Sequence, residues 1–249
     1  MNDDDERYSR QWDIVPAEKL AVCRATVVGV GAIGRQVALQ LAAVGIPWLQ
    51  LVDFDRVEPS NLASQGFLED DLGRPKVEAA ADLCQQINHR LEVHAVPHRF
   101  RRSQQVGSVI FSCVDRIDTR RQIWEAVTDQ VEFFCDGRMA AEVLRVITVS
   151  DFAGHRRYPA TLFAAQEAYA GSCTAKATIY CASVAAGMML SQFTKWLRGL
   201  AVDFDLQLNL LAAELAVDPT ANSAASQHRK GSVNYGSLVR QSDQPAPVV

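Results

Sequence analysis

Three glycines near residue 30 form the most informative local pattern in the sequence. Gly29-Val-Gly31-Ala-Ile-Gly34 closes the short β-branched run 25–30 and leads into residues 35–44, whose apolar side chains recur at helical spacing. Glycines at a strand-to-helix junction permit a tight turn. They also let phosphate oxygens approach backbone N–H groups at the positive end of the helix. The pattern therefore predicts a site for a phosphate-bearing ligand.

Charged residues after the next apolar run narrow the identity of that ligand. Residues 48–53 read as a second strand ending at Asp53, which can accept a hydrogen bond from a ribose hydroxyl. This acid alone favours NAD as much as ATP. Asp55, Asn61 and Lys76 follow it, and a dehydrogenase has no need for a second acid, an amide and a lysine there. A nucleoside triphosphate needs cations at its phosphates, so ATP is the better prediction.

Strands and helices alternate through the first half of the chain, which is typical of an open α/β sheet. After a polar loop through Asn61, we expect helices at 75–88 and 119–128 and strands at 91–96 and 109–114. We interpret the first half as a Rossmann-like, doubly wound, mostly parallel sheet with helices on both faces.

The pattern changes near residue 132. Residues 131–135 and 143–149 read as strands with no full helix between them, so the C-terminal half is expected to extend the sheet with antiparallel strands. A buried apolar helix is predicted at 181–197, followed by a strand or extended segment at 205–211. We expect one domain over residues 1–218 and a disordered tail over 219–249, which is rich in Ser, Asn, Gln, Ala and Pro.

Composition excludes several classes of function. With 25 Lys and Arg against 29 Asp and Glu, the net charge is −4, which disfavours binding to nucleic acid. No apolar run approaches the roughly 18 residues of a membrane span. The acidic start lacks the features of a signal peptide, so a cytoplasmic location is expected. The six scattered cysteines include no C-x-x-C pair, which argues against a structural zinc site.

Taken together, the motifs resemble the ThiF/MoeB and ubiquitin-activating enzyme superfamily. The resemblance rests on the glycine loop, on the segments 52–62 and 73–76, on Arg7-Tyr-Ser-Arg-Gln11 and on Cys113-Val-Asp115, and it runs from about residue 7 to residue 211. It implies an enzyme that uses ATP and Mg²⁺ to adenylate the C-terminal glycine carboxylate of a small ubiquitin-like protein.

The resemblance also implies roles for individual residues. The family's nucleotide loop is matched by Gly29, Gly31 and Gly34, and its ribose-side acids are matched by Asp53 and Asp55. The residues that contact the phosphates are matched by Asn61 and Lys76, and the Mg²⁺ ligand is matched by Asp115. Arg10 matches an arginine that is supplied to the partner subunit's phosphates, which requires at least a homodimer. Read alone, Lys76 could be a solvated first-turn lysine, Asp115 a helix N-cap and Arg10 a surface charge.

One departure from the family pattern concerns the phosphates. Ser64 stands where the family usually has an arginine, and a hydroxyl cannot replace a guanidinium at a phosphate. We expect Arg74 or Arg56 to compensate. Arg116 also replaces an asparagine that often follows the metal-binding acid.

Cys173, in Gly171-Ser-Cys-Thr-Ala-Lys176, resembles the thioester cysteine of ubiquitin-activating enzymes. Its thiolate could take the activated acyl group, helped by Lys176 or a helix N-terminus that lowers its pKa. The alternative is a thiol packed ahead of a helix. For the other five cysteines, core packing is the better interpretation. The resemblance thus favours a compact activating enzyme that passes its thioester to a conjugating enzyme.

Four other functions stay open at this point. One is a tRNA-modifying adenylating enzyme of the same fold, which the net charge of −4 disfavours. A sulfur-carrier adenylyltransferase of ThiF/MoeB type would not need Cys173. A non-catalytic nucleotide-binding partner subunit is favoured by Ser64 but opposed by the retention of Arg10, Lys76 and Asp115. An NAD dehydrogenase fits the glycine loop alone and leaves the later residues unexplained.

Overall fold

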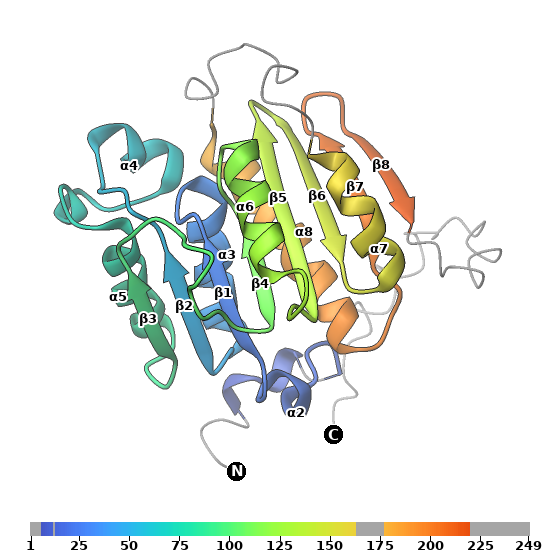
Figure 1. Ribbon diagram of the computed structural model, residues 1–249. Helices are drawn as coiled ribbons and strands as arrows, with labels where there is room; N and C mark the ends of the chain where they lie inside the picture. Colours follow the sequence, from blue (N-terminus) through green and yellow to red (C-terminus); the bar gives the residue numbers. More distant parts are fainter. Residues whose placement is uncertain (1–5, 12, 163–176, 220–249) are drawn as a thin grey trace, which may run out of the picture.

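The computed structural model describes residues 6–11, 13–162 and 177–219 (Figure 1). Within these residues an eight-stranded sheet has the order β3-β2-β1-β4-β5-β6-β7-β8. Its strands are β1 (Arg24–Val28), β2 (Trp48–Val52), β3 (Glu92–Val96), β4 (Val109–Ser112), β5 (Phe133–Ala140), β6 (Val143–Val149), β7 (Asp203–Asn209) and β8 (Glu214–Pro219). Strands β3, β2, β1, β4 and β5 are parallel, and β6, β7 and β8 extend the sheet in antiparallel fashion. The predicted fold class is confirmed.

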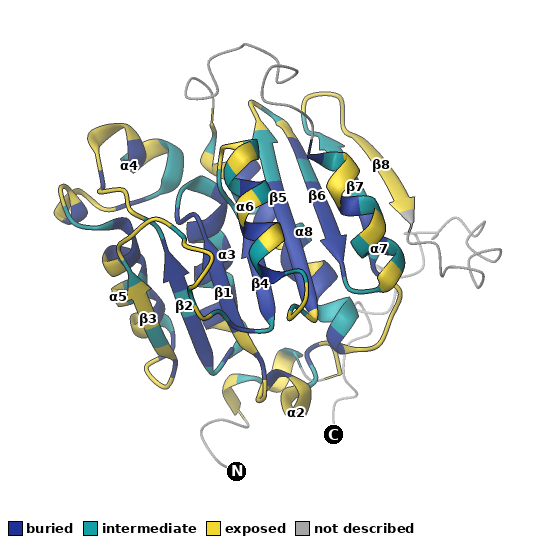
Figure 2. Ribbon diagram, viewed as in Figure 1, coloured by how far each residue is buried: buried dark blue, intermediate teal, exposed yellow. Residues whose placement is uncertain are grey.

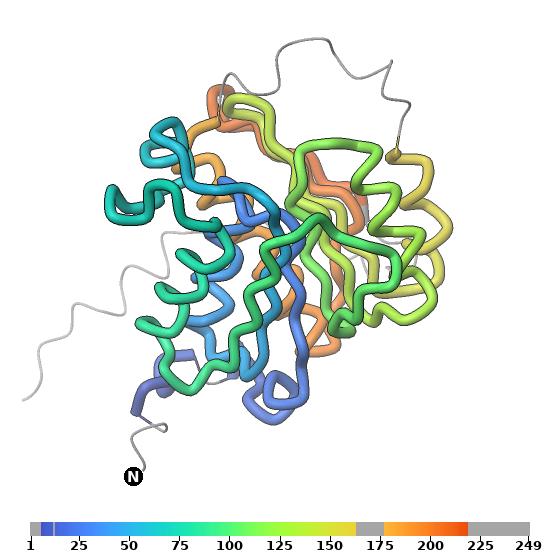
Figure 3. Tube along the Cα trace, turned by 60° about the vertical axis from the view of Figure 1, so that its left-hand side comes forward, coloured from blue at the N-terminus to red at the C-terminus, as the bar shows by residue number. Residues whose placement is uncertain are grey.

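Helices cover both faces of this sheet (Figures 1 and 3). One face carries α3 (Ala32–Val44), α5 (Lys76–Ile87) and α8 (Ile179–Leu197), and the other carries α6 (Ile117–Val127) and α7 (Phe152–Arg157). Side chains of β4 alternate between the two layers: Val109 and Phe111 join the core under α3 and α8, and Ile110 joins the core under α6. The central strands are consequently buried on both faces (Figure 2).

Shorter helical segments complete the described structure. They are η1 (Ser9–Gln11), α2 (Ala17–Leu20), α4 (Pro59–Gln65), η2 (Glu69–Asp71) and η3 (Tyr158–Thr161). No helix within the described ranges is both long and apolar enough to cross a membrane.

The chain connections reverse direction between β1 and β4, and we call the ligand-binding position that this reversal predicts the opening. Helices α3 and α5 carry the chain from β1 to β2 and then to β3, on one side of β1. The chain then returns to β4 on the other side of β1 and continues through α6 on the opposite face. Loops at the carboxyl ends of β1 and β4 therefore leave in opposite directions, which is where open α/β sheets bind ligands.

Three segments differ from the sequence-based predictions. Asn61 lies in α4 rather than in a loop, because Pro59 starts a short helix that Glu58 and Asn61 stabilise by a reciprocal capping box. Strand β5 runs on through residues 136–140, beyond the strand predicted at 131–135, because all of them pair with β6. Strand β8 pairs with β7 and includes Pro219, the first residue of the predicted tail. Residues 220–249 lie outside the described ranges.

Candidate nucleotide site

The glycine loop joins the end of β1 to α3, and its three glycines have different structural roles. Gly29 has φ +88°, and a Cβ there would lie 2.8 Å from the carbonyl carbon and oxygen of Cys113. A Cβ on Gly34 would overlap the carbonyl oxygen of Gly29. Gly31 is the N-cap of α3, and the nearest atom to its added Cβ would be Gln65 Oε1 at 3.8 Å. Two glycines thus allow close backbone packing, and Gly31 leaves space at the helix N-terminus.

Alanine substitutions distinguish the glycine that permits close packing from the glycine that leaves open space, because only the first should lower the free energy of unfolding. Gly34→Ala gains about 1 kcal/mol of helix propensity. The overlap with Gly29 outweighs this gain, so we expect a net loss of about 1–3 kcal/mol in the free energy of unfolding. Gly31→Ala is the matched control and is expected to change it by no more than about 0.5 kcal/mol. Urea unfolding measures both, and equal losses would contradict this division of roles.

Asp53 follows β2 directly and holds the glycine loop in place. Its carboxylate accepts hydrogen bonds from the backbone N–H of Val30 at 2.6 Å and of Asp55 at 2.9 Å. Burial raises the pKa of Asp53 above its usual range, and these two bonds oppose that rise. Each carboxylate oxygen keeps a further lone pair, so the contact with a ribose hydroxyl stays a prediction.

Lys76 and Asp55 meet beside this loop. Lys76 is the first residue of α5, and its Nζ lies 3.3 Å from a carboxylate oxygen of Asp55. The lysine side chain is only 7% exposed, whereas that of Asp55 is 48% exposed. The interpretation of Lys76 as a solvated lysine is therefore wrong. The structure places a buried cation next to the loop expected to bind phosphate.

Asn61 and Ser64 both make local contacts within α4. Asn61 Oδ1 accepts the backbone N–H of Glu58 at 3.0 Å, and Ser64 Oγ donates to the carbonyl of Ser60 at 2.7 Å. The amide nitrogen of Asn61 contacts Ser60 Oγ only at 3.4 Å. The predicted phosphate contact of Asn61 would use this nitrogen, because its oxygen already caps the helix.

The two arginines expected to compensate for Ser64 have other partners. Arg74 forms ion pairs with Asp71 at 3.1 Å and Asp82 at 2.5 Å, and Arg56 Nη1 donates to the carbonyl of Gly73 at 2.7 Å. A third arginine, Arg35, escaped the sequence analysis, although it directly follows Gly34 and is buried in the first turns of α3. Its place in the first turns of the predicted helix could have identified it, because helical side chains point back toward the helix N-terminus, where phosphate is expected.

Asp115 lies in the loop between β4 and α6 and is exposed. The N-cap of α6 is Arg116, which makes no capping bond through its side chain, so the interpretation of Asp115 as an N-cap is wrong. In the described part of the chain, no three His, Cys, Asp or Glu side chains gather in a way that could hold a metal. Mg²⁺ commonly binds one or two carboxylates together with phosphate oxygens and water, so a single exposed acid at the opening fits this ion.

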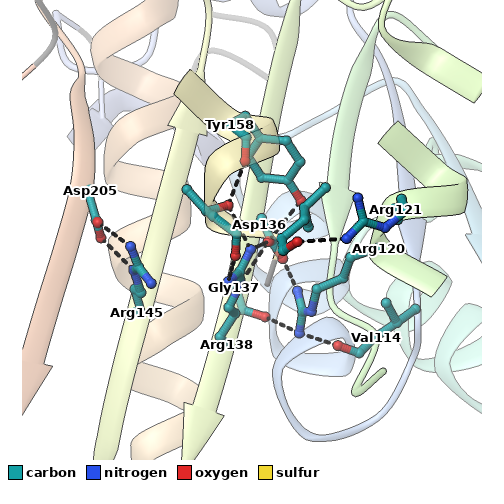
Figure 4. A network of polar contacts seen from close by, with 11 residues as sticks. Val114, Arg120, Arg121, Asp136, Gly137, Arg138, Arg145, Tyr158 and Asp205 are labelled. Carbon is teal, nitrogen blue, oxygen red and sulfur yellow. Dashed lines mark hydrogen bonds and ion pairs between the residues drawn. The ribbon is translucent and has the colours of Figure 1, made fainter. Parts of the chain in front are cut away.

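A buried ionic cluster supports the base of that loop (Figure 4). Asp136 of β5 is fully buried and is bonded by Arg120, by Arg138 at 2.7 Å and by the hydroxyl of Tyr158 at 2.9 Å. Arg120 also donates to the carbonyls of Val114 and of Gly137, the latter at 3.1 Å. The cluster thus connects β5 to the residue that precedes Asp115.

Arg10 lies away from the glycine loop of its own chain. It is exposed in η1, and its neighbour Gln11 donates to the carbonyl of Val44 at 2.8 Å, at the end of α3. With 13 residues at about 1.5 Å each, α3 separates this contact from the glycine loop by roughly 20 Å. The structure therefore does not bring Arg10 to the site formed by the other residues of this chain.

The structure describes five of the six cysteines. Cys173 lies outside the described residues. Cys23, Cys84, Cys135 and Cys181 are buried, and Cys113 is half-buried beside Gly34. Burial raises the pKa of Cys84 and of Cys135 to about 12, which keeps these thiols protonated at neutral pH. Core packing is an adequate role for all four buried cysteines.

The fold and this site define a recognisable class of protein. The model of the ThiF family matches residues 8–228 of the chain. The protein belongs to this family.

Individual relatives match less than half of the chain. The chain is 34% identical to a molybdopterin-synthase adenylyltransferase of Salmonella typhimurium over 128 residues, which cover 47% of this chain and 51% of that one. It is 40% identical to a SAMP-activating enzyme E1 of Haloferax volcanii over 104 residues, covering 39% and 38%. The chain therefore spans about half or less of these relatives' length. The crystal structure of PaaA has the same fold, with a TM-score of 0.73 and 21% identity over 88% of this chain and 74% of that one.

Proposed function

We propose that the protein is an ATP-dependent adenylyltransferase that activates the C-terminal carboxylate of a small ubiquitin-like protein. The observation that carries the proposal is the buried cation Lys76 next to Asp55, Asp53 and the glycine loop. A buried lysine near a helix N-terminus suits the phosphates of a nucleotide, and an acid at the end of β2 suits its ribose. The names of the relatives, one an adenylyltransferase and one an activating enzyme, support the same reaction.

The proposed reaction joins two anions. A carboxylate oxygen of the ubiquitin-like protein attacks the α-phosphorus of ATP, and the bond to the departing pyrophosphate breaks. Cations must offset the repulsion between the carboxylate and the phosphates. Lys76 supplies one from the same chain, and Mg²⁺, held by Asp115, supplies further positive charge when bound.

The proposal includes a homodimer. Arg10 is exposed and lies at the far end of α3 from its own glycine loop. An arginine in that place can serve a nucleotide only if the nucleotide is bound by a partner subunit. We therefore propose that each subunit lends Arg10 to the other.

Cys173 is proposed to act after adenylation. Its thiolate attacks the activated carbonyl carbon and forms a thioester. The bond between that carbon and the phosphate oxygen breaks, and AMP leaves. The acyl group then passes to a conjugating enzyme. This step rests on the Cys-Thr motif at residues 173–174.

Intact mass spectrometry tests the whole sequence of steps. The full chain is incubated with Mg-ATP and a candidate ubiquitin-like protein from its genomic neighbourhood. We expect a covalent adduct that dithiothreitol removes. Adenylate without an adduct would instead favour the sulfur-carrier adenylyltransferase, a second candidate supported by the name of the Salmonella relative. The absence of both products with ATP still bound would favour a non-catalytic partner subunit.

The variant Cys173→Ala separates the two chemical steps. ATP–pyrophosphate exchange reports adenylation alone, and we expect it to stay within about 2-fold of the wild-type rate while the adduct disappears. Cys23→Ala is the control, because Cys23 lies on the core side of the N-terminal segment and should leave the adduct intact. An adduct that survives in Cys173→Ala would show that the thioester forms elsewhere or not at all.

A further inference from the structure

Arg35 is a buried charge whose hydrogen bonds are poorly satisfied. Its side chain is 5% exposed in the first turns of α3, and its Nε is buried without a hydrogen-bond partner among the described residues. Nη1 donates to the carbonyl of Gln65 only at the long distance of 3.4 Å. A buried guanidinium normally has strong partners, because leaving its donors unpaired is costly.

The groups around Arg35 do not supply such a partner. The guanidinium lies over the ring of Phe67, with 5.0 Å between its central carbon and the ring centroid. Asp71 is the acid that attracts it most, but among the described residues no ion pair or hydrogen bond joins the two side chains. The Asp71 carboxylate instead accepts from Arg74 at 3.1 Å and from the backbone N–H of Leu68 at 3.1 Å. Arg35 therefore keeps donor capacity that the described part of the chain does not use.

A second unsatisfied group lies at the same junction. Gln65 Oε1 is buried and also has no hydrogen-bond partner within the described ranges. This side chain faces the open position at Gly31, since a Cβ on Gly31 would lie 3.8 Å from Oε1. The glycine loop, Gln65 and Arg35 thus meet where the N-terminus of α3 approaches the C-terminus of α4.

We propose that the guanidinium of Arg35 binds the phosphates of the nucleotide, from α3, and supplies the cation that Ser64 cannot. This inference rests on the proposed function and adds the residue that completes its phosphate site. Arginine forms paired hydrogen bonds with phosphate oxygens, so a phosphate group would satisfy several donors at once. Ser64 adjoins Gln65, whose carbonyl Arg35 contacts at 3.4 Å, so residues 35 and 64 lie close to the same junction of α3 and α4.

Nucleotide affinity and stability together test this role. Arg35→Met keeps the length and apolar stem of the side chain and removes the charge. We expect the Kd for ATP, measured by calorimetry with the full chain and Mg²⁺, to rise about 10–100-fold. The Kd for adenosine, which has no phosphate, should change less than about 2-fold. The unfolding temperature should stay equal or rise, because an unpaired buried charge is removed.

Three further variants serve as controls for this test. Arg24→Met is the matched control, since Arg24 stacks on Trp48 at the start of β1, away from the glycine loop, and its loss should leave the Kd for ATP unchanged. Adding Ser64→Arg to Arg35→Met should recover about 10-fold or more of the lost ATP affinity. Arg35→Lys, which retains a charge, should weaken ATP binding less than Arg35→Met does.

Other outcomes of these measurements would contradict the proposed role of Arg35. Equal losses of ATP and adenosine affinity, a lower unfolding temperature or a failure of Arg35→Met to fold would assign Arg35 a structural role. Unchanged ATP affinity in Arg35→Met would overturn the inference and leave the proposed function standing. Wild-type protein that binds no ATP would overturn the proposed function itself.

Discussion

Replacing Lys76 with alanine is expected to slow ATP–pyrophosphate exchange by about 10²–10³-fold. The ammonium group is buried next to the glycine loop, where low polarity strengthens its interaction with phosphate. Its partner Asp55 is half-exposed and loses little when the pair is broken, so the free energy of unfolding should change by less than about 1 kcal/mol. Exchange measured with labelled pyrophosphate, together with urea unfolding, separates the loss of activity from a loss of structure.

Lys195 provides the control for this prediction. It also pairs with an aspartate, Asp203, with 2.6 Å between Nζ and the carboxylate oxygen, but it lies in the last turn of α8. Lys195→Ala should leave exchange unchanged. If Lys76→Ala retained the wild-type rate, the buried lysine would have a structural role and the adenylation site would have to be sought elsewhere.

Asp136→Asn is expected to cause the largest loss of stability, about 3–5 kcal/mol in the free energy of unfolding. The carboxylate is fully buried and is the shared partner of Arg120 and Arg138, whose side chains are 6% and 13% exposed (Figure 4). Burial lowers the pKa of both guanidinium groups, because desolvation disfavours their charged form. Neutralising Asp136 leaves two buried positive charges side by side.

The matched control is the pair between Arg145 and Asp205, which joins β6 to β7 at 2.6 Å. Its arginine is 31% exposed, so solvent can replace much of the lost interaction. Asp205→Asn should therefore cost about 1 kcal/mol, and urea unfolding measures both variants. Equal losses would mean that burial does not set the strength of the cluster around Asp136.

Local patterns predicted the elements that form the centre of the fold. The glycine loop, the strand that ends at Asp53 and helix α5 have strong signals, because apolar periodicity and glycine or proline boundaries appear within a few residues. Helix α4 has seven largely polar residues and shows no apolar period, so its capping box was not recognised. Strand β8 is mostly exposed and gains its structure from pairing with β7.

The site was only partly predictable for a different reason. Lys76 and Asp55 were identified as candidates, but their contact depends on the pairing of residue 56 with residue 75, which no local pattern reveals. Arg120, Asp136 and Tyr158 meet at one buried point only because β4 and β5 pair in a particular register and the segment after α7 packs beside them. No local sequence pattern predicts that arrangement. Burial of Arg35 likewise follows from the approach of α4 to α3.

The strand order has a consequence for how such a site can change over evolutionary time. The opening between β1 and β4 exists because successive connections leave in opposite directions, so no single side chain is needed to form it. A cation serving a ligand in that opening can therefore come from any helix whose end borders it. Under our proposal, the exchange of an arginine on α4 for one on α3 is such a relocation, and it leaves the architecture untouched.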